Sequence, residues 1–151
     1  MSSEINKAIV RRLVDEGTNQ NNYAVFDELI APNVIDHTAQ SGQPQGVDAV
    51  KQGHHAFKTA FPDAYSTIEE MIAEGELVAY RIRMQATNTG PFMEQPPTGN
   101  VFIGGGMNMV RIVNGQLVEH WSFLDTLGML QQLGLLHLPV TMQIGGSIPP
   151  Q

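Results

Sequence analysis

Three segments in the first half of the chain carry apolar residues at the spacing of amphipathic helices. Within each segment an apolar side chain recurs every three or four residues, which places these side chains on one helix face. The segments cover residues 5–17, 23–30 and 47–61. Pro32 and Pro62 end the second and third segments, because proline does not continue a helix. His54 and Phe57 fall on the apolar stripe of the third predicted helix, so we expect both to face the interior.

The hydrophobic period changes to that of β-strands from Tyr65 onward. Two hairpins are indicated, one around Glu74-Gly75-Glu76 and one around Asn114-Gly115. Their strands are expected over residues 67–73, 77–86, 101–113 and 116–124, with a closing helix over 125–136. This order predicts a single α+β domain over residues 1–136, in which a cone-shaped, curled, four-stranded antiparallel sheet packs against the N-terminal helices around an internal pocket. Residues 137–151 are expected to form an extended tail.

The Asn114-Gly115 turn decides which strand residues share a face. An Asn-Gly pair is the strongest short hairpin signal, because both residues of such a turn adopt positive φ. A two-residue turn pairs Val110 with Glu119 and Asn108 with Trp121, and alternation then groups every second residue on one face. The face carries Asn108, Val110, Glu119, Trp121, Phe123 and Asp125. Carboxylates buried beside aromatic side chains are destabilising unless they have a function, so we expect this face to line the pocket.

The composition describes one ordered domain without cysteine chemistry. Of 151 residues, 42% are hydrophobic and 15% are charged. A formal net charge of −7 argues against nucleic acid or an anionic membrane surface as a partner. There is no cysteine, and the five histidines lack the close spacing of ligands, so no metal site is expected. No apolar run approaches the roughly 20 residues that span a bilayer, and the start Met-Ser-Ser-Glu lacks signal-peptide features, which predicts a cytoplasmic protein.

The opposite face of the predicted sheet is also apolar. Met107, Met109 and Val118 fall there, and His120 joins them by alternation. The helices of the chain can cover only one face of the sheet. We therefore expect a homodimer or a higher homo-oligomer that buries the second face.

Asp125 is the main candidate for acid/base chemistry, and it also fits a structural role. It stands where the last strand becomes the closing helix, and aspartate is a favoured helix N-cap. Alternatively, burial near Trp121 and Phe123 would raise its pKa and make it a base at the pocket mouth. His37 follows a short extended segment and lies either on the surface or at the pocket edge, where it would support Asp125.

The other polar and aromatic candidates have structural alternatives as well. Glu119 is expected to be a buried ion-pair partner of Arg81 or Arg83. Trp121 is either a core residue or a platform for a ligand. His54 is either a hydrogen-bonded core histidine or a pocket residue. A Gly-x-Ser-x-Gly motif is absent from the sequence, which removes the usual hydrolase nucleophile.

Several short motifs follow one another along residues 5–135. They are Ile35-Asp36-His37, Phe61-Pro62-Asp63, Val78-Ala79-Tyr80-Arg81, Thr89-Gly90-Pro91-Phe92, Pro96-Pro97-Thr98-Gly99, Asn114-Gly115, Glu119-x-Trp121-x-x-x-Asp125 and Gln132-Leu133-Gly134. In this order they resemble the SnoaL-like polyketide cyclases, a family within the nuclear transport factor 2-like superfamily of cone-shaped α+β domains. The ordered set is specific for the family and not for a substrate.

The resemblance implies a cofactor-free intramolecular aldol condensation on a polyketide-like carbonyl compound. In the family an aspartate removes the acidic proton next to an ester, and the enolate attacks a carbonyl to close a ring. The motif carries that role to Asp125. Similar sequences often have Thr-His-Thr-Gly where this chain has Thr87-Asn88-Thr89-Gly90, so a histidine that could assist proton transfer is replaced here. The residues expected around the substrate are His54, Phe57, Arg81, Asn108, Glu119, Trp121 and Phe123.

Two other functions remain open from the sequence. A non-catalytic protein could use the same pocket to bind an apolar small molecule. The fold also supports hydration or isomerisation, as in ketosteroid isomerases or limonene-epoxide hydrolases. An ordinary capping role for Asp125 would favour the binding protein, whereas a base poised near neutral pH would favour catalysis.

Overall fold

The computed structural model describes residues 2–137 of the chain, in which most helices come first and four long strands follow. In order, the elements are α1 (Ser3–Arg12), the π-helical segment η1 (Leu13–Thr18), α2 (Tyr23–Leu29), β1 (Ile30–Asp36), α3 (Val47–Ala60), β2 (Tyr65–Glu74), β3 (Leu77–Thr87), β4 (Val101–Val113), β5 (Gln116–Leu124) and α4 (Thr126–Gln132). Within this part of the chain, no helix is long and apolar enough to cross a membrane. The predicted tail from residue 138 onward lies outside the described residues.

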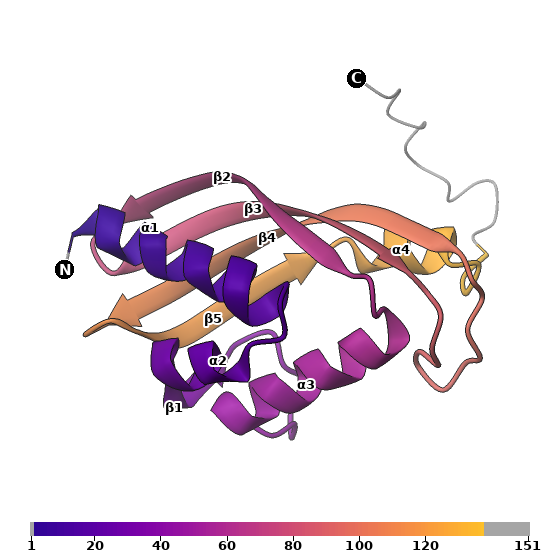
Figure 1. The fold of residues 1–151 in the computed structure, drawn as a ribbon, viewed down its shortest axis with the longest axis horizontal. Coiled ribbons are helices and arrows are strands. Elements are labelled where there is room, and N and C mark those ends of the chain that lie inside the picture. The colour runs from indigo at the N-terminus through magenta and orange to yellow at the C-terminus, as the bar shows by residue number, and fades with distance from the viewer. Residues whose placement is uncertain (1, 138–151) are drawn as a thin grey trace.

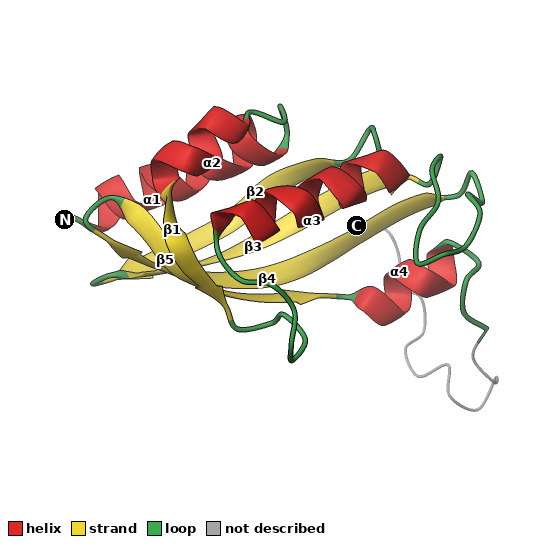
Figure 2. Ribbon diagram, turned by 90° about the horizontal axis from the view of Figure 1, so that it is seen from below, coloured by secondary structure: helices red, strands yellow, loops and turns green. Residues whose placement is uncertain are grey.

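A single sheet holds the domain together, with the strand order β1-β5-β4-β3-β2. Strands β2 to β5 form the predicted antiparallel meander. Helices α1, α2 and α3 lie along one face of the curved sheet, and α4 lies at the end where β5 finishes (Figures 1 and 2). The α+β class and the curled sheet against N-terminal helices are therefore confirmed. The prediction of four antiparallel strands missed β1, which pairs in parallel with β5 and forms the fifth strand.

The second hairpin contains both the predicted turn and an unpredicted bulge. Asn114 and Gly115 form the two-residue turn with φ values of 49° and 79°. The register then shifts because Leu117 and Glu119 pair with consecutive residues of β4, which leaves Val118 as an extra residue. Such a bulge reverses the facing of every residue beyond it, because side chains alternate with a period of two.

The predicted pairing beyond this bulge was consequently wrong by one residue. Val110 pairs with His120 instead of Glu119, and Asn108 pairs with Ser122 instead of Trp121. His120 and Ser122 therefore share the inner, helix-covered face with Asn108 and Val110. The residues that the sequence placed in the pocket from this strand, namely Glu119, Trp121 and Phe123, lie on the outer face.

The buried interior consists of two apolar clusters at opposite ends of the helix-covered face. The first cluster joins the helices to the middle of the sheet, with Val10, Phe26, Val34, Val78 and Val110 among its members. The second lies near α4 and includes Phe61, Phe102 and Leu133, each with no exposed surface. Near the second cluster, position 104 is a glycine because the Phe102 ring occupies the space that a Cβ of residue 104 would need. Phe57 packs against this cluster, with its ring centroid 4.8 Å from that of Phe61.

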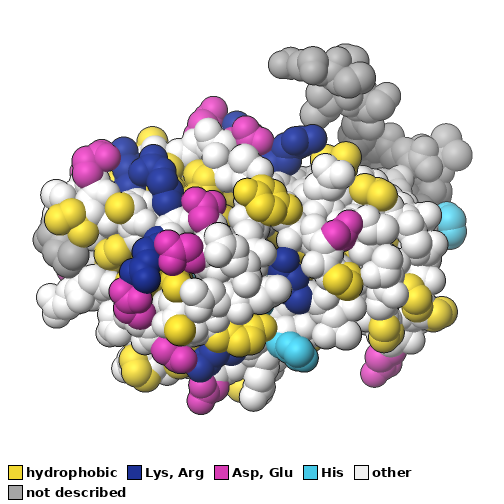
Figure 3. Space-filling model, viewed as in Figure 1, with side chains coloured by type: hydrophobic (Ala, Val, Ile, Leu, Met, Phe, Trp, Pro, Cys, Tyr) yellow, Lys and Arg dark blue, Asp and Glu magenta, His cyan; other side chains and the backbone are white. Residues whose placement is uncertain are grey.

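Some of the charged side chains in Figure 3 lie next to side chains of opposite sign, whereas others stand alone. Arg12 contacts Glu16 at 3.2 Å and Glu28 at 2.6 Å. Lys51 contacts Asp27 at 2.6 Å. Such exposed ion pairs add little to stability.

Candidate functional site

Two adjoining cavities lie between the helices and the inner face of the sheet. The deeper one has a volume of about 120 Å³ and the outer one about 290 Å³. They share four lining residues, Val34, Asp36, Val50 and His120, so these residues form the neck between them. Leu13, Val14, Phe26, Ile30 and Leu117 add apolar wall to the deeper cavity. Apolar walls with a few polar groups are typical of a small-molecule site, and together these cavities form the interior cavity discussed below.

His120 brings an imidazole to the neck of the interior cavity. Its Nε2 lies 3.3 Å from Oδ1 of Asn108, the buried neighbour on β4. Asp36 stands opposite His120 in the parallel pairing of β1 with β5. Burial lowers the pKa of His120, and the negative charge of Asp36 acts in the opposite direction. The neck therefore holds a neutral imidazole with a carboxylate beside it.

Tyr80 adds a phenol to the deeper cavity. It is the β3 partner of Asn108 in the sheet, and it lines the deeper cavity together with His120. Burial raises the pKa of the Tyr80 hydroxyl above its ordinary value. The hydroxyl therefore stays protonated near neutral pH and can donate a hydrogen bond to an oxygen in the cavity.

His54 borders the outer cavity with both ring nitrogens engaged. Its Nε2 lies 3.0 Å from the carbonyl oxygen of Thr18, and its Nδ1 lies 3.1 Å from the Tyr23 hydroxyl. A carbonyl oxygen only accepts, so Nε2 carries the proton and Nδ1 accepts from Tyr23. Burial lowers the pKa of His54. The side chain thus fits the expectation of a hydrogen-bonded core histidine and also forms part of the cavity wall.

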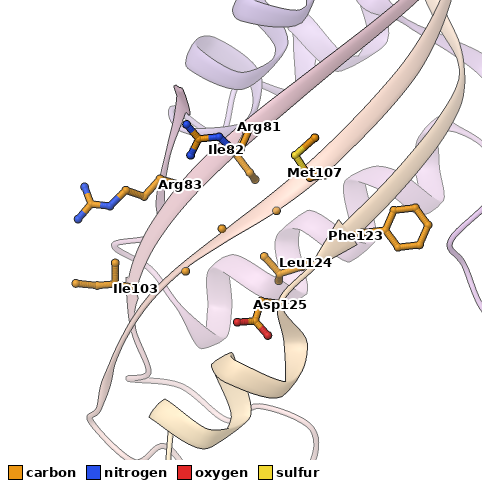
Figure 4. A pocket seen from close by; sticks show the side chains of 11 residues that line it. Arg81, Ile82, Arg83, Ile103, Met107, Phe123, Leu124 and Asp125 are labelled. Atoms are coloured by element: carbon orange, nitrogen blue, oxygen red, sulfur yellow. The ribbon is translucent and has the colours of Figure 1, made fainter. Parts of the chain in front are cut away.

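Asp125 caps α4 and lies away from the interior cavity. Its Oδ1 accepts a hydrogen bond of 2.9 Å from the backbone N–H of Gly128. It borders a separate trough of about 520 Å³ on the outer face of the sheet, whose floor is Gly104-Gly105-Gly106 (Figure 4). Arg81 and Phe123 line the same trough. These three predicted site residues therefore border one trough on the outer face, but the Phe123 ring points away from Asp125 and Arg81 (Figure 4).

Three other predicted site residues form a cluster at the surface. The rings of His37 and Trp121 stack with centroids 4.6 Å apart, and Nε2 of His37 lies 3.0 Å from Oε1 of Glu119. Glu119 Oε2 accepts a hydrogen bond of 2.6 Å from Arg111. The hydrogen bonds from His37 and Arg111 hold the pKa of Glu119 below its usual range. Glu119 is thus an ion-pair partner, but the prediction of a buried pair with Arg81 or Arg83 was wrong.

Asn88 has a structural role at the position where similar sequences often have histidine. The side chain is fully buried, and its Nδ2 donates to the carbonyl oxygen of Gly90 at 2.8 Å. Its Oδ1 accepts a hydrogen bond of 2.9 Å from the backbone N–H of Thr98. Asn88 therefore ties together the two ends of the crossing between β3 and β4, away from the residues that line the interior cavity.

The predicted single pocket is thus divided among several places. His54 lines the interior cavity and Asn108 contacts the cavity residue His120, whereas Phe57 belongs to the second apolar cluster. Sequence reasoning missed Asp36, Tyr80 and His120 as cavity residues. Asp36 and Tyr80 lie within the short motifs noted above, but a motif does not tell which face a residue occupies. In the part of the chain that the structure describes, no three histidine or acidic side chains converge as metal ligands would.

Comparison with known proteins finds similarity along nearly the whole described part. A family model described as SnoaL-like polyketide cyclase matches residues 8–133. Aklanonic acid methyl ester cyclase DnrD from Streptomyces peucetius is 27% identical over 140 residues, covering 89% of this chain and 92% of that protein. Nogalonic acid methyl ester cyclase from Streptomyces nogalater is 29% identical over 110 residues, covering 72% of this chain and 82% of that protein. The crystal structure of IdmH from Streptomyces antibioticus has a TM-score of 0.75 and 31% identity, covering 85% of this chain and 98% of that one.

Proposed function

Since this chain belongs to the SnoaL-like polyketide cyclase family, we propose that it closes a ring by an intramolecular aldol condensation without a cofactor. The proposed substrate is a polyketide-like compound that carries a methyl ester and a ketone within reach of each other. Relatives named as methyl ester cyclases support this substrate class. The proposed site is the interior cavity.

The observation that carries this proposal is the polar neck of an otherwise apolar cavity. Ring closure needs an acceptor for the proton of the acidified C–H and a donor for the oxygen that becomes negative. Asp36 and His120 supply acceptors at the neck, and Tyr80 supplies a donor in the deeper part. Apolar walls would hold the remainder of the substrate and exclude water from the enolate.

A substitution at the neck tests whether the interior cavity is the site. Val50→Phe adds bulk where the two cavities meet, so cyclisation of aklanonic acid methyl ester or nogalonic acid methyl ester should fall by about a hundredfold through displacement of the substrate. Ile103→Ala, in the outer trough, is the matched control and should retain the wild-type rate. Ring closure can be followed by chromatography of the product.

The opposite result would move the site to the outer trough. There, Asp125 with Arg81 and Phe123 remains the alternative acid/base site that the family motif suggests. Loss of cyclisation in Ile103→Ala together with full activity in Val50→Phe would support that location and contradict the interior one.

A binding protein without catalysis is the second candidate function. The hydrogen bond between Asp125 and the Gly128 amide favours it, because it gives the motif aspartate a structural role as the cap of α4. Such a protein would bind either ester tightly in calorimetry and return it unchanged. Turnover by the wild-type chain would exclude this function.

We further propose that a second copy of the chain covers the outer face of the sheet. His120 was expected on this outer face but lies on the inner one. Trp121 and Phe123 take the outer face instead, which makes it more apolar than predicted. Its exposed apolar residues include Ile72 at 72%, Phe123 at 68% and Met107 at 53%. Exposed apolar side chains gathered on one face favour association. Phe123→Lys should shift the mass in light scattering toward the monomer, and a monomeric wild type at micromolar concentration would contradict the proposal.

A further inference from the structure

We propose that His120 is the acid/base residue of the interior cavity and that Nδ1 is the atom that takes the substrate proton. This inference rests on the proposed cyclase function and specifies its base. Asn108 and Asp36 act through His120 as positioning residues. The base is thus a histidine on the inner face of β5, and Asp125 keeps its role as the cap of α4.

The position of His120 follows from the bulge at Val118. The extra residue turns His120 inward, so that its ring lies where the deeper and the outer cavity meet. A substrate that fills both cavities has to pass this neck. The reacting carbon of such a substrate would therefore lie beside the imidazole, as general base catalysis requires.

The hydrogen bond to Asn108 selects which ring nitrogen is free. Oδ1 of the Asn108 amide can only accept, so Nε2 of His120 carries the proton at this 3.3 Å contact. Nδ1 then holds the lone pair. The pairing of Asn108 with Tyr80 on β3 and with Ser122 on β5 fixes the backbone from which the amide projects.

The charges around the ring suit a group that gains and returns a proton. Three titratable side chains share the cavities with His120, namely Asp36 from β1, His54 from α3 and Tyr80 from β3. Asp36 favours the imidazolium, and the Thr38 N–H and hydroxyl hold one of its carboxylate oxygens at 2.9 and 2.7 Å. His54 has both nitrogens engaged, so it does not compete for the substrate proton.

The step balances without any further reactant. The His120 Nδ1 lone pair takes the proton from the carbon next to the ester, and the C–H electrons form the enolate. The enolate carbon attacks the ketone carbon, one C–C bond forms, and the C=O π bond becomes an alkoxide. The Tyr80 hydroxyl donates a hydrogen bond to that oxygen, and the His120 imidazolium returns the proton to it. The product is an isomer of the substrate, and the imidazole is neutral again.

Turnover by matched variants tests the role of His120. His120→Gln keeps a polar side chain and removes the base, so kcat for either methyl ester should fall by about a hundredfold or more. His55→Gln is the control, because His55 is exposed on α3. A His120→Gln variant that cyclises at the wild-type rate would overturn the inference, most directly if Asp125→Asn were inactive in the same assay.

A second measurement does not depend on turnover and separates the two proposals. 1-Hydroxyanthraquinone carries an ionisable phenol, and its phenolate absorbs visible light at longer wavelength. In the wild-type cavity an imidazolium at His120 would stabilise the bound phenolate, so half-ionisation should occur about one to two pH units lower than in His120→Gln, where burial alone acts on the phenol. His120→Gln should bind the neutral phenol without this shift. If the wild type lowers the pH of half-ionisation but closes no ring, the cyclase function is refuted while the role of His120 as a base is retained. If the pH of half-ionisation is the same in the wild type and in His120→Gln, the role of His120 as the base is overturned.

The pH profile of Asp36→Asn tests the positioning role. Loss of the carboxylate removes a favourable charge from the imidazolium, so the acid limb of the kcat/KM profile should move to lower pH by about one unit. A residue that only supports the fold would lower the rate without moving the limb. An unmoved limb would therefore remove Asp36 from the proposal.

Discussion

The cap at Asp125 offers a sharp test of how the chain uses this carboxylate. Asp125→Ala removes the acceptor of the 2.9 Å hydrogen bond from Gly128 and leaves that N–H at the helix start without a side-chain partner. Loss of an N-cap oxygen costs about 1 kcal/mol, within a range of roughly 0.5–2 kcal/mol. Helix α4 carries Met129 into the second apolar cluster, and Leu133 follows, so loosening its start affects buried contacts. For a domain of this size, such a loss lowers Tm by roughly 2–4 °C.

Urea unfolding followed by the fluorescence of Trp121 measures this effect, because Trp121 is the single tryptophan of the chain. Asp125→Asn is the matched variant, because its amide oxygen can still accept the capping hydrogen bond. Its free energy of unfolding should therefore fall by only a fraction of the decrease caused by Asp125→Ala. An unchanged midpoint for Asp125→Ala would refute the energetic role of the cap. If Asp125→Asn were as stable as the wild type yet failed to cyclise the methyl esters, the reasoning that places the base in the interior cavity would be refuted.

Three further predictions concern buried groups. Gly104→Ala would drive a methyl group into the Phe102 ring and should lower the free energy of unfolding by about 1–3 kcal/mol, measured in urea. Asn88→Ala would leave the Thr98 N–H without its side-chain acceptor, cost about 1–3 kcal/mol, and speed proteolysis of the crossing between β3 and β4. Burial lowers the pKa of His54 below 6.5, so the folded state binds fewer protons than the unfolded state and loses stability as pH falls below that value. His54→Gln should make this decline shallower in urea midpoints measured from pH 7 to pH 5.

The elements of the fold were predictable because each has a local cause. Helix spacing, proline stops and the Asn114-Gly115 turn are properties of short segments, and the structure confirms the elements that they indicate. The pairing of β1 with β5 was not predictable in this way, since a parallel partner comes from a distant part of the chain. The short extended segment before His37 was visible, but nothing local showed which strand it joins.

The candidate site was less predictable, because one residue reversed the faces of β5. No feature of Val118 distinguishes it from an ordinary strand residue, yet as the extra residue of the bulge it shifts the pairing of β5 with β4 by one residue from the predicted register. As a result, the Glu119 and Trp121 side chains were assigned to the pocket while His120 was assigned to the outside. The family motif lies on β5, which lines the interior cavity, and only the register decided which of its side chains face that cavity.

Because β1 pairs in parallel with β5, the interior cavity can form only late in translation, after β5 has been synthesised. His37, just after β1, and Glu119 of β5 are 82 residues apart, so α1 to α3 and β1 leave the ribosome long before their partner strand exists. Until β5 arrives, β1 has no strand beside it and its apolar Val34 lacks part of its cover. Ordering so long an intervening segment costs entropy before any pairing compensates it. A nascent chain that ends before β5 would therefore lack one cavity wall and also the strand that anchors β1, which leaves it exposed to chaperones and proteases.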